Sequence, residues 1–498
     1  MIKLSLSVIT ILTFIFQSNA QTQGVAYTAV GKGVATTFVT DYHSLGVNSS
    51  ALGWGTGYEG KKFTMGMTEF SLGIYSDNLS SDKLSSLYQA IRNEVTGKEQ
   101  ATDSWATQAE NAADYLQTGI SIDATYNWFG ASFQNEKFGG IAVNIQEQYN
   151  WYSKLSADVS GITFQGKFSD YFDQLTVVYG ADTTTISNSG NISNDTLEHV
   201  VAGTLAAPLS LAAVTKGTDI KFSWNRYYNI GYGRKLFGDS TFALYAGIGG
   251  RFIQSTAMFN FTSDDDGLSL QSSVSPNFDI NYGSIANSNP TTFTDRGKSI
   301  PTSVGSGYGL DFSVSAILFK RLKIGAAVNN IGSVTYNRNV YNVRDTLVGE
   351  IALDGLSNNN VTNAMDIFLK EGGLLNLVGA EKIKVANAAT FRVGGSIDFG
   401  KKASIGVDFV APFNRDNPGS IENAVFSIGG EIKPLKWLAL SAGYYGGGIY
   451  KSNIPVGINF ILGDGTYEFG ISSRDALAFF TKGSNSVSTA FGVMRFRF

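Results

Sequence analysis

Residues suited to acid–base, nucleophilic or metal chemistry are scarce in this chain of 498 residues. It contains no cysteine and two histidines, His43 and His199, which lie far apart in the sequence. A serine hydrolase needs a histidine base within hydrogen-bond reach of its nucleophile, and transition-metal sites draw on clusters of cysteine and histidine. We therefore expect no enzyme activity, no metal centre and no cofactor.

Two further patterns resemble ligand sites but lack the context that such sites require. Asp264, Asp265 and Asp266 form an acidic run without the alternating ligands and later glutamate of an EF-hand loop, so we favour a solvated loop. The stretches "GYGRKLFG" and "GIGGRF" lack the strand, helix and lysine of a phosphate-binding loop. A formal net charge of −4, with scattered basic residues, also argues against nucleic acid as a partner.

Two opposite charges remain as candidates, because Glu147 and Arg226 each interrupt an otherwise apolar face of an alternating segment. If the two segments pair antiparallel with Tyr152 near Asp219, these charges lie opposite each other within about two residues. A basic residue facing lipid costs about 2–4 kcal/mol at mid-bilayer, and an opposed carboxylate offsets part of that cost. Two interpretations stay open: a strand changes face at a bulge, or this wall contacts a protein or forms a lateral gate.

Alternation of apolar and polar residues with period two dominates the chain from Lys62 onward. In "GGIAVNIQEQYNWY" one face is apolar apart from Glu147, whereas the other is rich in amides. Such a split suits a strand between lipid and water. The amide side chains expected to line an aqueous lumen are Asn144, Gln146, Gln148 and Asn150.

Fourteen segments show this alternation, most of them near the length that a tilted strand needs to cross a bilayer. We expect strands over residues 62–76, 119–133, 138–152, 219–236, 240–255, 306–319, 322–336, 388–400, 402–411, 422–433, 437–446, 454–462, 466–474 and 486–498.

The connections between these segments alternate between short and long along the chain. Short turns on one side and long loops on the other are typical of a transmembrane β-barrel, whereas a secreted β-sandwich or propeller has no reason to show this order. The sequence therefore predicts an all-β membrane protein, a 14-stranded antiparallel transmembrane β-barrel with large extracellular loops. Helical periodicity over residues 80–95 and 361–377 predicts that these loops are partly helical.

The start of the chain predicts export. Lys3, an apolar run and small residues up to Ala20 have the layout of a cleavable signal peptide. We expect a signal peptide over 1–20, an N-terminal hatch or plug over 21–61 and the barrel over 62–498. The expected location is the outer membrane of a Gram-negative bacterium, in contact with lipid and lipopolysaccharide.

The segment before the first strand carries a partial motif, with Asp41 followed by Asn48 and then Ala51. Here the chain resembles the FadL-like outer-membrane β-barrel family, whose Bacteroidota-type relatives include the shuttle barrel of type IX secretion. The family signature has a proline after the asparagine, whereas "NSSAL" has none. The resemblance implies a hatch in the lumen and a side exit near the third strand, through which hydrophobic substrate reaches the membrane.

The chain ends "STAFGVMRFRF", with Met494, Phe496 and Phe498 on one side of the last strand and Arg495 and Arg497 on the other. We expect this strand to close the barrel against the first strand near Lys62. A terminal phenylalanine in such alternation is similar to the signal that barrel-assembly machinery recognises.

Two functions follow from these features. The resemblance implies passive uptake of hydrophobic small molecules through a hatch-gated lumen or lateral opening. The large loops favour the alternative, a non-conducting subunit of an outer-membrane secretion or assembly complex with other envelope proteins as partners. The apolar stretch 199–214 fits either the small core of a folded loop or a docking groove.

Overall fold

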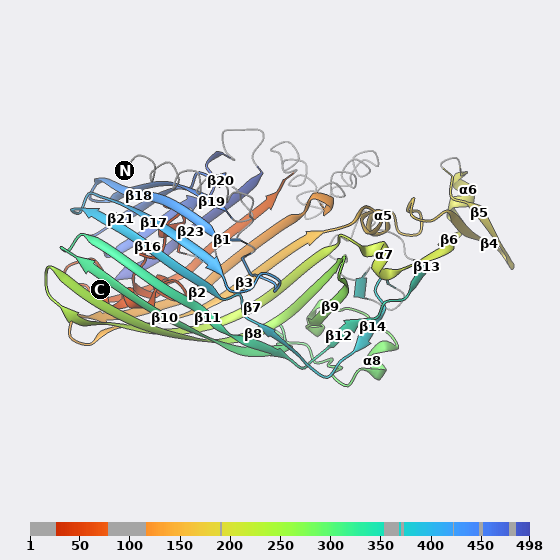
Figure 1. Ribbon diagram of the computed structural model, residues 1–498, viewed down its shortest axis with the longest axis horizontal. Coiled ribbons are helices and arrows are strands. Elements are labelled where there is room, and N and C mark those ends of the chain that lie inside the picture. Colours follow the sequence, from red (N-terminus) through yellow and green to blue (C-terminus); the bar gives the residue numbers. More distant parts are fainter. Residues whose placement is uncertain are drawn as a thin grey trace, which may run out of the picture.

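The computed structural model describes residues 26–77, 116–189, 192–352, 368–369, 373–421, 423–447, 452–477 and 485–498. Figure 1 shows a long barrel of tilted strands with additional elements gathered at one end. We call this the loop end, and the opposite end, where short connections join the strands, the turn end. Most of residues 80–95 and 361–377, where helices are expected, lie outside the described residues.

Within the described residues, fourteen strands pair antiparallel into a closed ring, which confirms the predicted barrel. In ring order the strands are β1 (Phe63–Ser76), β2 (Ile120–Asn135), β3 (Gly139–Lys154), β7 (Asp219–Gly238), β8 (Phe242–Asp264), β10 (Gly305–Leu318), β11 (Leu322–Tyr336), β16 (Thr390–Phe399), β17 (Ala403–Pro412), β18 (Val425–Leu435), β19 (Leu438–Gly447), β21 (Val456–Leu462), β22 (Tyr467–Ser473) and β23 (Ser486–Arg497).

The ring closes between the first and last strands. Strand β23 pairs with β1 from Tyr75 opposite Ser486 to Thr64 opposite Arg497. The carbonyl oxygen of Phe498 then accepts hydrogen bonds from the amides of Lys62 and Phe63, at 2.7 and 3.0 Å. The last residue is therefore part of the seam, and neither strand is left with an unpaired edge.

The two faces of the wall differ in polarity as the alternation predicts. Large apolar side chains such as Ile141, Ile230 and Phe312 are exposed on the outside, whereas Asn144, Asn229 and Ser313 are buried on the inside. An apolar outer band around a polar interior is the arrangement of a barrel that sits in a lipid bilayer. Among the described residues, no helix is both long and apolar enough to span a membrane.

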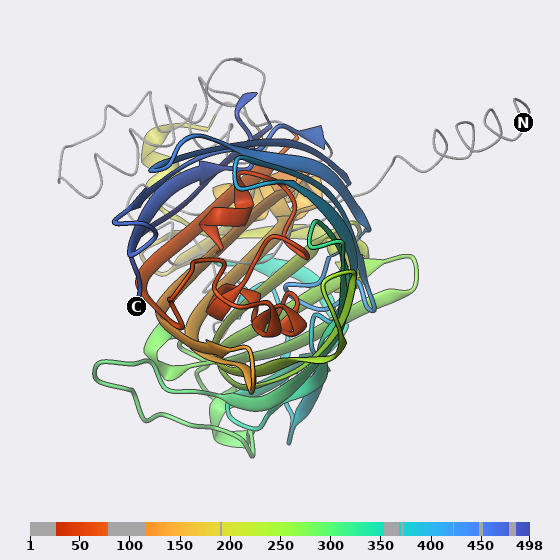
Figure 2. The same ribbon diagram turned by 90° about the vertical axis from the view of Figure 1, so that its left-hand side faces the viewer.

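The N-terminal segment, residues 26–58, lies inside the barrel. Figure 2 looks into the turn end and shows this segment across the mouth of the ring. It contains helix α2 (Tyr27–Val30) and the 3-10 helices η1 (Asp41–Ser44) and η2 (Ser49–Trp54).

The loop end contains further strands and helices that the alternation does not predict. Strand β8 continues to Asp264 rather than ending at 255, because a hairpin with β9 extends it. The stretch 199–214, expected as a loop, forms strand β6 and most of helix α7. The additional elements are α5 (Ala157–Gln165), β4 (Gln174–Tyr179), β5 (Asp182–Ser187), α6 (Asn194–Glu198), β6 (Val200–Ser210), α7 (Leu211–Thr215), β9 (Gly267–Val274), η3 (Pro276–Phe278), α8 (Ile285–Ser288), β12 (Val340–Val343), β13 (Leu347–Ile351), β14 (Leu377–Gly379), β15 (Ile383–Ala386) and β20 (Ser452–Asn453).

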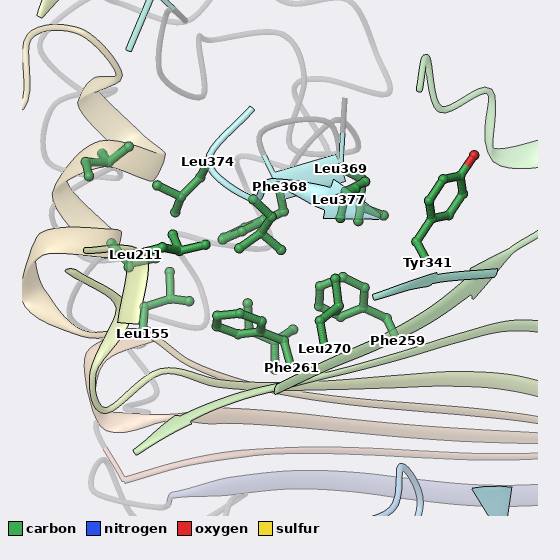
Figure 3. Close-up of a cluster of buried hydrophobic side chains, with 14 of the residues drawn as sticks. Leu155, Leu211, Phe259, Phe261, Leu270, Tyr341, Phe368, Leu369, Leu374 and Leu377 are labelled. Carbon is green, nitrogen blue, oxygen red and sulfur yellow. The ribbon is translucent and has the colours of Figure 1, made fainter. Parts of the chain in front are cut away.

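A hydrophobic core at the loop end packs α5, α7, β9, β12, β13 and β14 onto the outer face of β7 and β8, and Figure 3 shows part of this core. One extra residue in β8, Thr256, shifts its register against β7, so that Phe259 beyond it lies opposite Phe222 on the outer face. Leu211 of α7 and Leu270 of β9 belong to the same buried cluster. This part of the wall is therefore covered by protein rather than exposed.

The seam yields a first prediction. Deleting Phe498 removes the oxygen that accepts from the amides of Lys62 and Phe63, so we expect a lower folded fraction after insertion into lipid vesicles. Phe498→Ala keeps the carbonyl and loses the ring contact with Phe63, and should have a smaller effect. Heat-dependent gel mobility measures the folded fraction.

Phe399→Ala is the matched control, because Phe399 is 58% exposed and Phe498 is 59% exposed, yet Phe399 lies away from the seam. A deletion that folds as completely as this control would contradict the role of Phe498.

Candidate functional site

Glycines of the wall allow the N-terminal segment to approach the strand backbones. A Cβ atom on Gly233 of β7 would lie 2.1 Å from the carbonyl oxygen of Ser49, and one on Gly247 of β8 would lie 2.2 Å from the amide nitrogen of Ser50. Atoms cannot approach so closely without a shift of the backbone. These two glycines therefore form part of the wall surface against which the segment packs.

A buried ionic network joins the segment to the last two strands. Asp41 of η1 accepts a hydrogen bond from the Arg495 guanidinium of β23. The Oε2 atom of Glu468 on β22 accepts from Arg495 Nη1 at 3.0 Å and from Arg497. All four side chains are buried. The two guanidiniums are thus balanced by two carboxylates, one of which comes from the segment.

A second buried cluster ties the segment to β1 and β2 through Glu69. This carboxylate accepts hydrogen bonds from the Tyr42 hydroxyl at 2.5 Å and from Asn127 Nδ2 at 2.9 Å, and His43 Nε2 lies 3.0 Å from both of its oxygens. Burial, followed by the nearby Glu69 charge, raises the pKa of Tyr42 well above its usual range. Tyr42 therefore remains protonated and acts as a donor.

The predicted motif residues lie where the segment folds back on itself. Asn48 Nδ2 donates to the carbonyl oxygen of Thr36 at 2.8 Å, and Asn48 Oδ1 accepts from the Ser50 hydroxyl at 2.6 Å. Ala51 follows in η2 and is completely buried. The asparagine thus bridges two parts of the segment across a turn that has no proline.

Ser50 also joins the segment to the wall. Its amide donates to Ser313 Oγ at 2.8 Å, and its hydroxyl lies 2.6 Å from Ser315 Oγ, both on β10. Three and four strands further around the ring, Asp408 of β17 accepts from the amide of Thr36 at 2.9 Å, and Lys32 pairs with Glu431 of β18 at 2.8 Å. The segment is therefore held by polar contacts around much of the ring.

A small cavity of about 30 Å³ lies against the inner face of the wall, toward the loop end. Four amide side chains line it together with apolar residues of β8 and β11, and these amides belong to Asn150, Asn225, Asn330 and Asn387. A volume of this size has room for at least one water molecule. Of the predicted lumen residues, Asn150 lines this cavity and Asn144 accepts a hydrogen bond from Asn229 at 2.6 Å, while Gln146 and Gln148 are half-buried.

Glu147 and Arg226 lie directly opposite each other in the β3–β7 register and form an ion pair. The register is continuous from Gly140 to Lys154, so neither strand changes face at a bulge here. Both side chains share the outer face with Val143, yet they are only 12% and 13% exposed. Trp224 Nε1 donates to Glu147 Oε2 at 2.7 Å, which supplies a further partner for the carboxylate.

Sequence patterns did not indicate Glu69, Glu468 or Arg495 as members of a lumen network. The sequence signal that could have indicated this network is the alternation of Arg495 and Arg497 with aromatic residues in the last strand. Among the described residues, no group of three or more histidine, aspartate and glutamate side chains is arranged to hold a metal ion.

The closed ring, the apolar outer band and the polar, filled lumen define a membrane-embedded β-barrel with an internal N-terminal segment. A family model described as "Family of unknown function (DUF5723)" matches residues 179–466. This match covers more than half of the chain, and the chain belongs to that family. No curated protein matches the sequence.

Solved outer-membrane barrels resemble the chain over nearly its whole length. The toluene transporter TodX of Pseudomonas putida is 10% identical, with 97% of this chain and 99% of that chain covered and a TM-score of 0.42. The toluene transporter TbuX of Ralstonia pickettii is 12% identical, with coverages of 96% and 99% and a TM-score of 0.42. A FadL homologue of Pseudomonas aeruginosa is 9% identical, with coverages of 96% and 98% and a TM-score of 0.37. At such identities the resemblance assigns no substrate.

The ionic network yields a second prediction. Arg495→Met leaves the buried Asp41 without its guanidinium, so we expect a loss of about 3–5 kcal/mol in the free energy of unfolding. Equilibrium urea unfolding in lipid vesicles measures this loss. The double variant Asp41→Asn/Arg495→Met should recover part of it, because the uncompensated charge is removed.

Lys433→Met is the control, because the Lys433 side chain is one-third exposed and its partner Glu431 keeps Lys32. Its expected loss is below about 1 kcal/mol. Equal losses for Arg495→Met and Lys433→Met would contradict the buried network.

Proposed function

We propose that the protein is a FadL-like channel of the outer membrane, in which the N-terminal segment is a hatch for passive uptake of small hydrophobic molecules. The observation that carries the proposal is the attachment of the segment to the lumen wall by ion pairs and hydrogen bonds. Neutral protein hydrogen bonds contribute only about 0.5–1.5 kcal/mol each and those to charged groups about 1.5–3 kcal/mol, because water replaces them when they open. A segment held in this way can move without exposing a large apolar core.

The lumen supports gating rather than a standing pore. The segment lies across the mouth of the ring (Figure 2) and is bonded to β10, β17 and β18, so we expect a substrate to pass only when the segment moves. The substrate class rests on the motif of Asp41, Asn48 and Ala51, which resembles that of barrels for hydrophobic compounds.

We place a lateral exit between β3 and β7, at the pair of Glu147 and Arg226. The pair lies on the outer face, where an isolated charge is unfavourable, and each charge is compensated only while the two strands stay together. Separation of the strands at this point would open the wall toward the membrane. The packed loop-end elements beyond Trp224 would keep the outer parts of both strands in place.

A cysteine pair tests the hatch, since the natural chain has no cysteine. In Ser50→Cys/Ser315→Cys the two sulfur atoms replace hydroxyls that lie 2.6 Å apart, so oxidation should fix the segment to β10. We expect uptake of a small aromatic hydrocarbon into vesicles to fall to background on oxidation and to return on reduction.

The control is Thr215→Cys/Ser263→Cys, whose hydroxyls are 2.9 Å apart at the loop end and involve no part of the segment. Full uptake by the oxidised Ser50/Ser315 variant would show that the segment does not move during transport.

A second cysteine pair tests the lateral exit. We expect Glu147→Cys/Arg226→Cys, joined by a short bifunctional maleimide, to block uptake, because β3 and β7 can no longer part. The same reagent on Val143→Cys/Ile230→Cys, which pair on the same outer face nearer the turn end, should inhibit less. Uptake that is unchanged by cross-linking at Glu147 and Arg226 would place the exit elsewhere.

A second candidate function is a non-conducting subunit of an outer-membrane secretion or assembly complex. The observation that favours it is a four-stranded sheet that projects from the loop end (Figure 1). Purification in mild detergent distinguishes the two functions. Stoichiometric partner proteins would support the subunit, whereas bound lipid or fatty acid in a lone barrel would support the channel.

A further inference from the structure

A four-stranded sheet forms an arm that is separate from the barrel sheet. We define the arm as residues 166–210 together with β13, and its strand order is β13-β6-β4-β5. Leu175, Val177 and Val200 form its small core, with Phe168 and Ile186 packed against them. In Figure 1 strands β4 and β5 lie at the far right, beyond the end of the barrel.

Strand β5 is an open edge of this sheet within the described part of the chain. It pairs with β4 from Asp182 opposite Tyr179 to Ser187 opposite Gln174, without a register shift. Its sequence, DTTTIS, is exposed except for the half-buried Ile186. It contains neither proline nor lysine, the residues with which proteins commonly protect an edge, and threonine favours strands.

The opposite edge of the same sheet is built differently. The register between β13 and β6 shifts between Val348 and Glu350, where residues 205–208 of β6 lie opposite Gly349 alone, and Pro208 packs against Gly349. Bulges of this kind discourage the addition of another strand. The contrast identifies β5 as the edge that remains regular and accessible.

The arm also concentrates negative charge. It has six acidic residues and one lysine, Lys167, which gives a net formal charge of −5, whereas the whole chain has −4. The acidic residues, all exposed, are Asp170, Asp173, Asp182, Asp195, Glu198 and Glu350. The rest of the chain is therefore close to neutral, and the excess charge lies around the sheet that has the open edge.

We propose that β5 is a docking edge for an extended, basic segment of a partner protein, which adds to the arm as a fifth strand. Unpaired backbone groups of an edge select an extended peptide, and the charge of the arm selects lysine and arginine over acidic residues. A second copy of this chain is disfavoured as the occupant, because pairing β5 with β5 would bring two arms of charge −5 together. This function goes beyond transport and does not require an open lumen.

The experiment uses the full-length protein in detergent and labelled peptides as probes. One peptide has four Lys-Val repeats, a second has four Glu-Val repeats, and a third is the Lys-Val peptide with two central valines replaced by proline. We expect the Lys-Val peptide to bind at least about tenfold more tightly than either control at low salt, and to weaken as salt is added. Fluorescence anisotropy measures binding. Equal affinity for the Lys-Val and Glu-Val peptides would overturn the proposal.

Variants of the edge locate the contact. Successive residues of a strand direct their N–H groups to opposite sides. Of the two variants Thr184→Pro and Thr185→Pro, one therefore removes an N–H that points away from β4 and leaves the bonds to β4 intact. We expect this variant to keep the folded barrel and arm, as judged by gel mobility and protease resistance, and to lose the peptide.

Charge is tested separately. Asp182→Lys on β5 should weaken binding of the Lys-Val peptide by about tenfold, whereas Asp266→Lys, an equal charge change on an exposed turn off the arm, should not. Equal effects of these two variants would overturn the assignment to β5. So would a dimer of the protein that depends on β5 and excludes the peptide.

Discussion

The lumen depends on the compensation of two buried arginines in the strand that closes the barrel. Arg495 and Arg497 point inward from β23, and Glu468 of β22 contacts both of them. A single carboxylate leaves one positive charge in a buried environment, which is unfavourable unless it is paired. Asp41 of the N-terminal segment provides the second carboxylate. The seam and the segment therefore form one electrostatic unit, although they come from opposite ends of the chain.

The same constraint explains why the segment is polar where it meets the wall. A barrel of fourteen strands encloses more space than its inward side chains fill, so additional chain occupies the interior. The wall carries amides, hydroxyls and charges on its inner face. The segment supplies a partner for individual groups of the wall. Its Thr36 amide donates to Asp408, and its Lys32 pairs with Glu431. Glycines such as Gly233 and Gly247 then let the backbones come together.

The sequence predicts the barrel well and its additions less well, for physical reasons. Lipid outside and water inside impose a strict alternation, so the predicted β11, 322–336, agrees with the structure at both ends, and β10 differs by one residue at each end. At the loop end no such solvent boundary exists, so β6 shows little alternation, and it pairs with β13, which is distant in sequence. The opposition of Glu147 and Arg226 could be predicted because register follows from pairing of adjacent wall strands. The contact of Asp41 with Arg495 could not, because no periodicity relates a plug residue to a wall residue.

Charge is distributed differently in the lumen and on the arm, and this difference separates their functions. In the lumen each buried charge described above faces an opposite charge or hydrogen-bond donors within the chain, so the interior has little to offer a charged partner. On the arm the six carboxylates are exposed and only Lys167 opposes them. A surplus of one sign of charge at an exposed site attracts the opposite sign over about a Debye length. The arm can therefore attract a charged partner before contact, whereas groups in the lumen interact with a molecule only after it has entered. An uptake function in the lumen and a docking function on β5 are therefore compatible in one chain, since neither uses the contacts of the other.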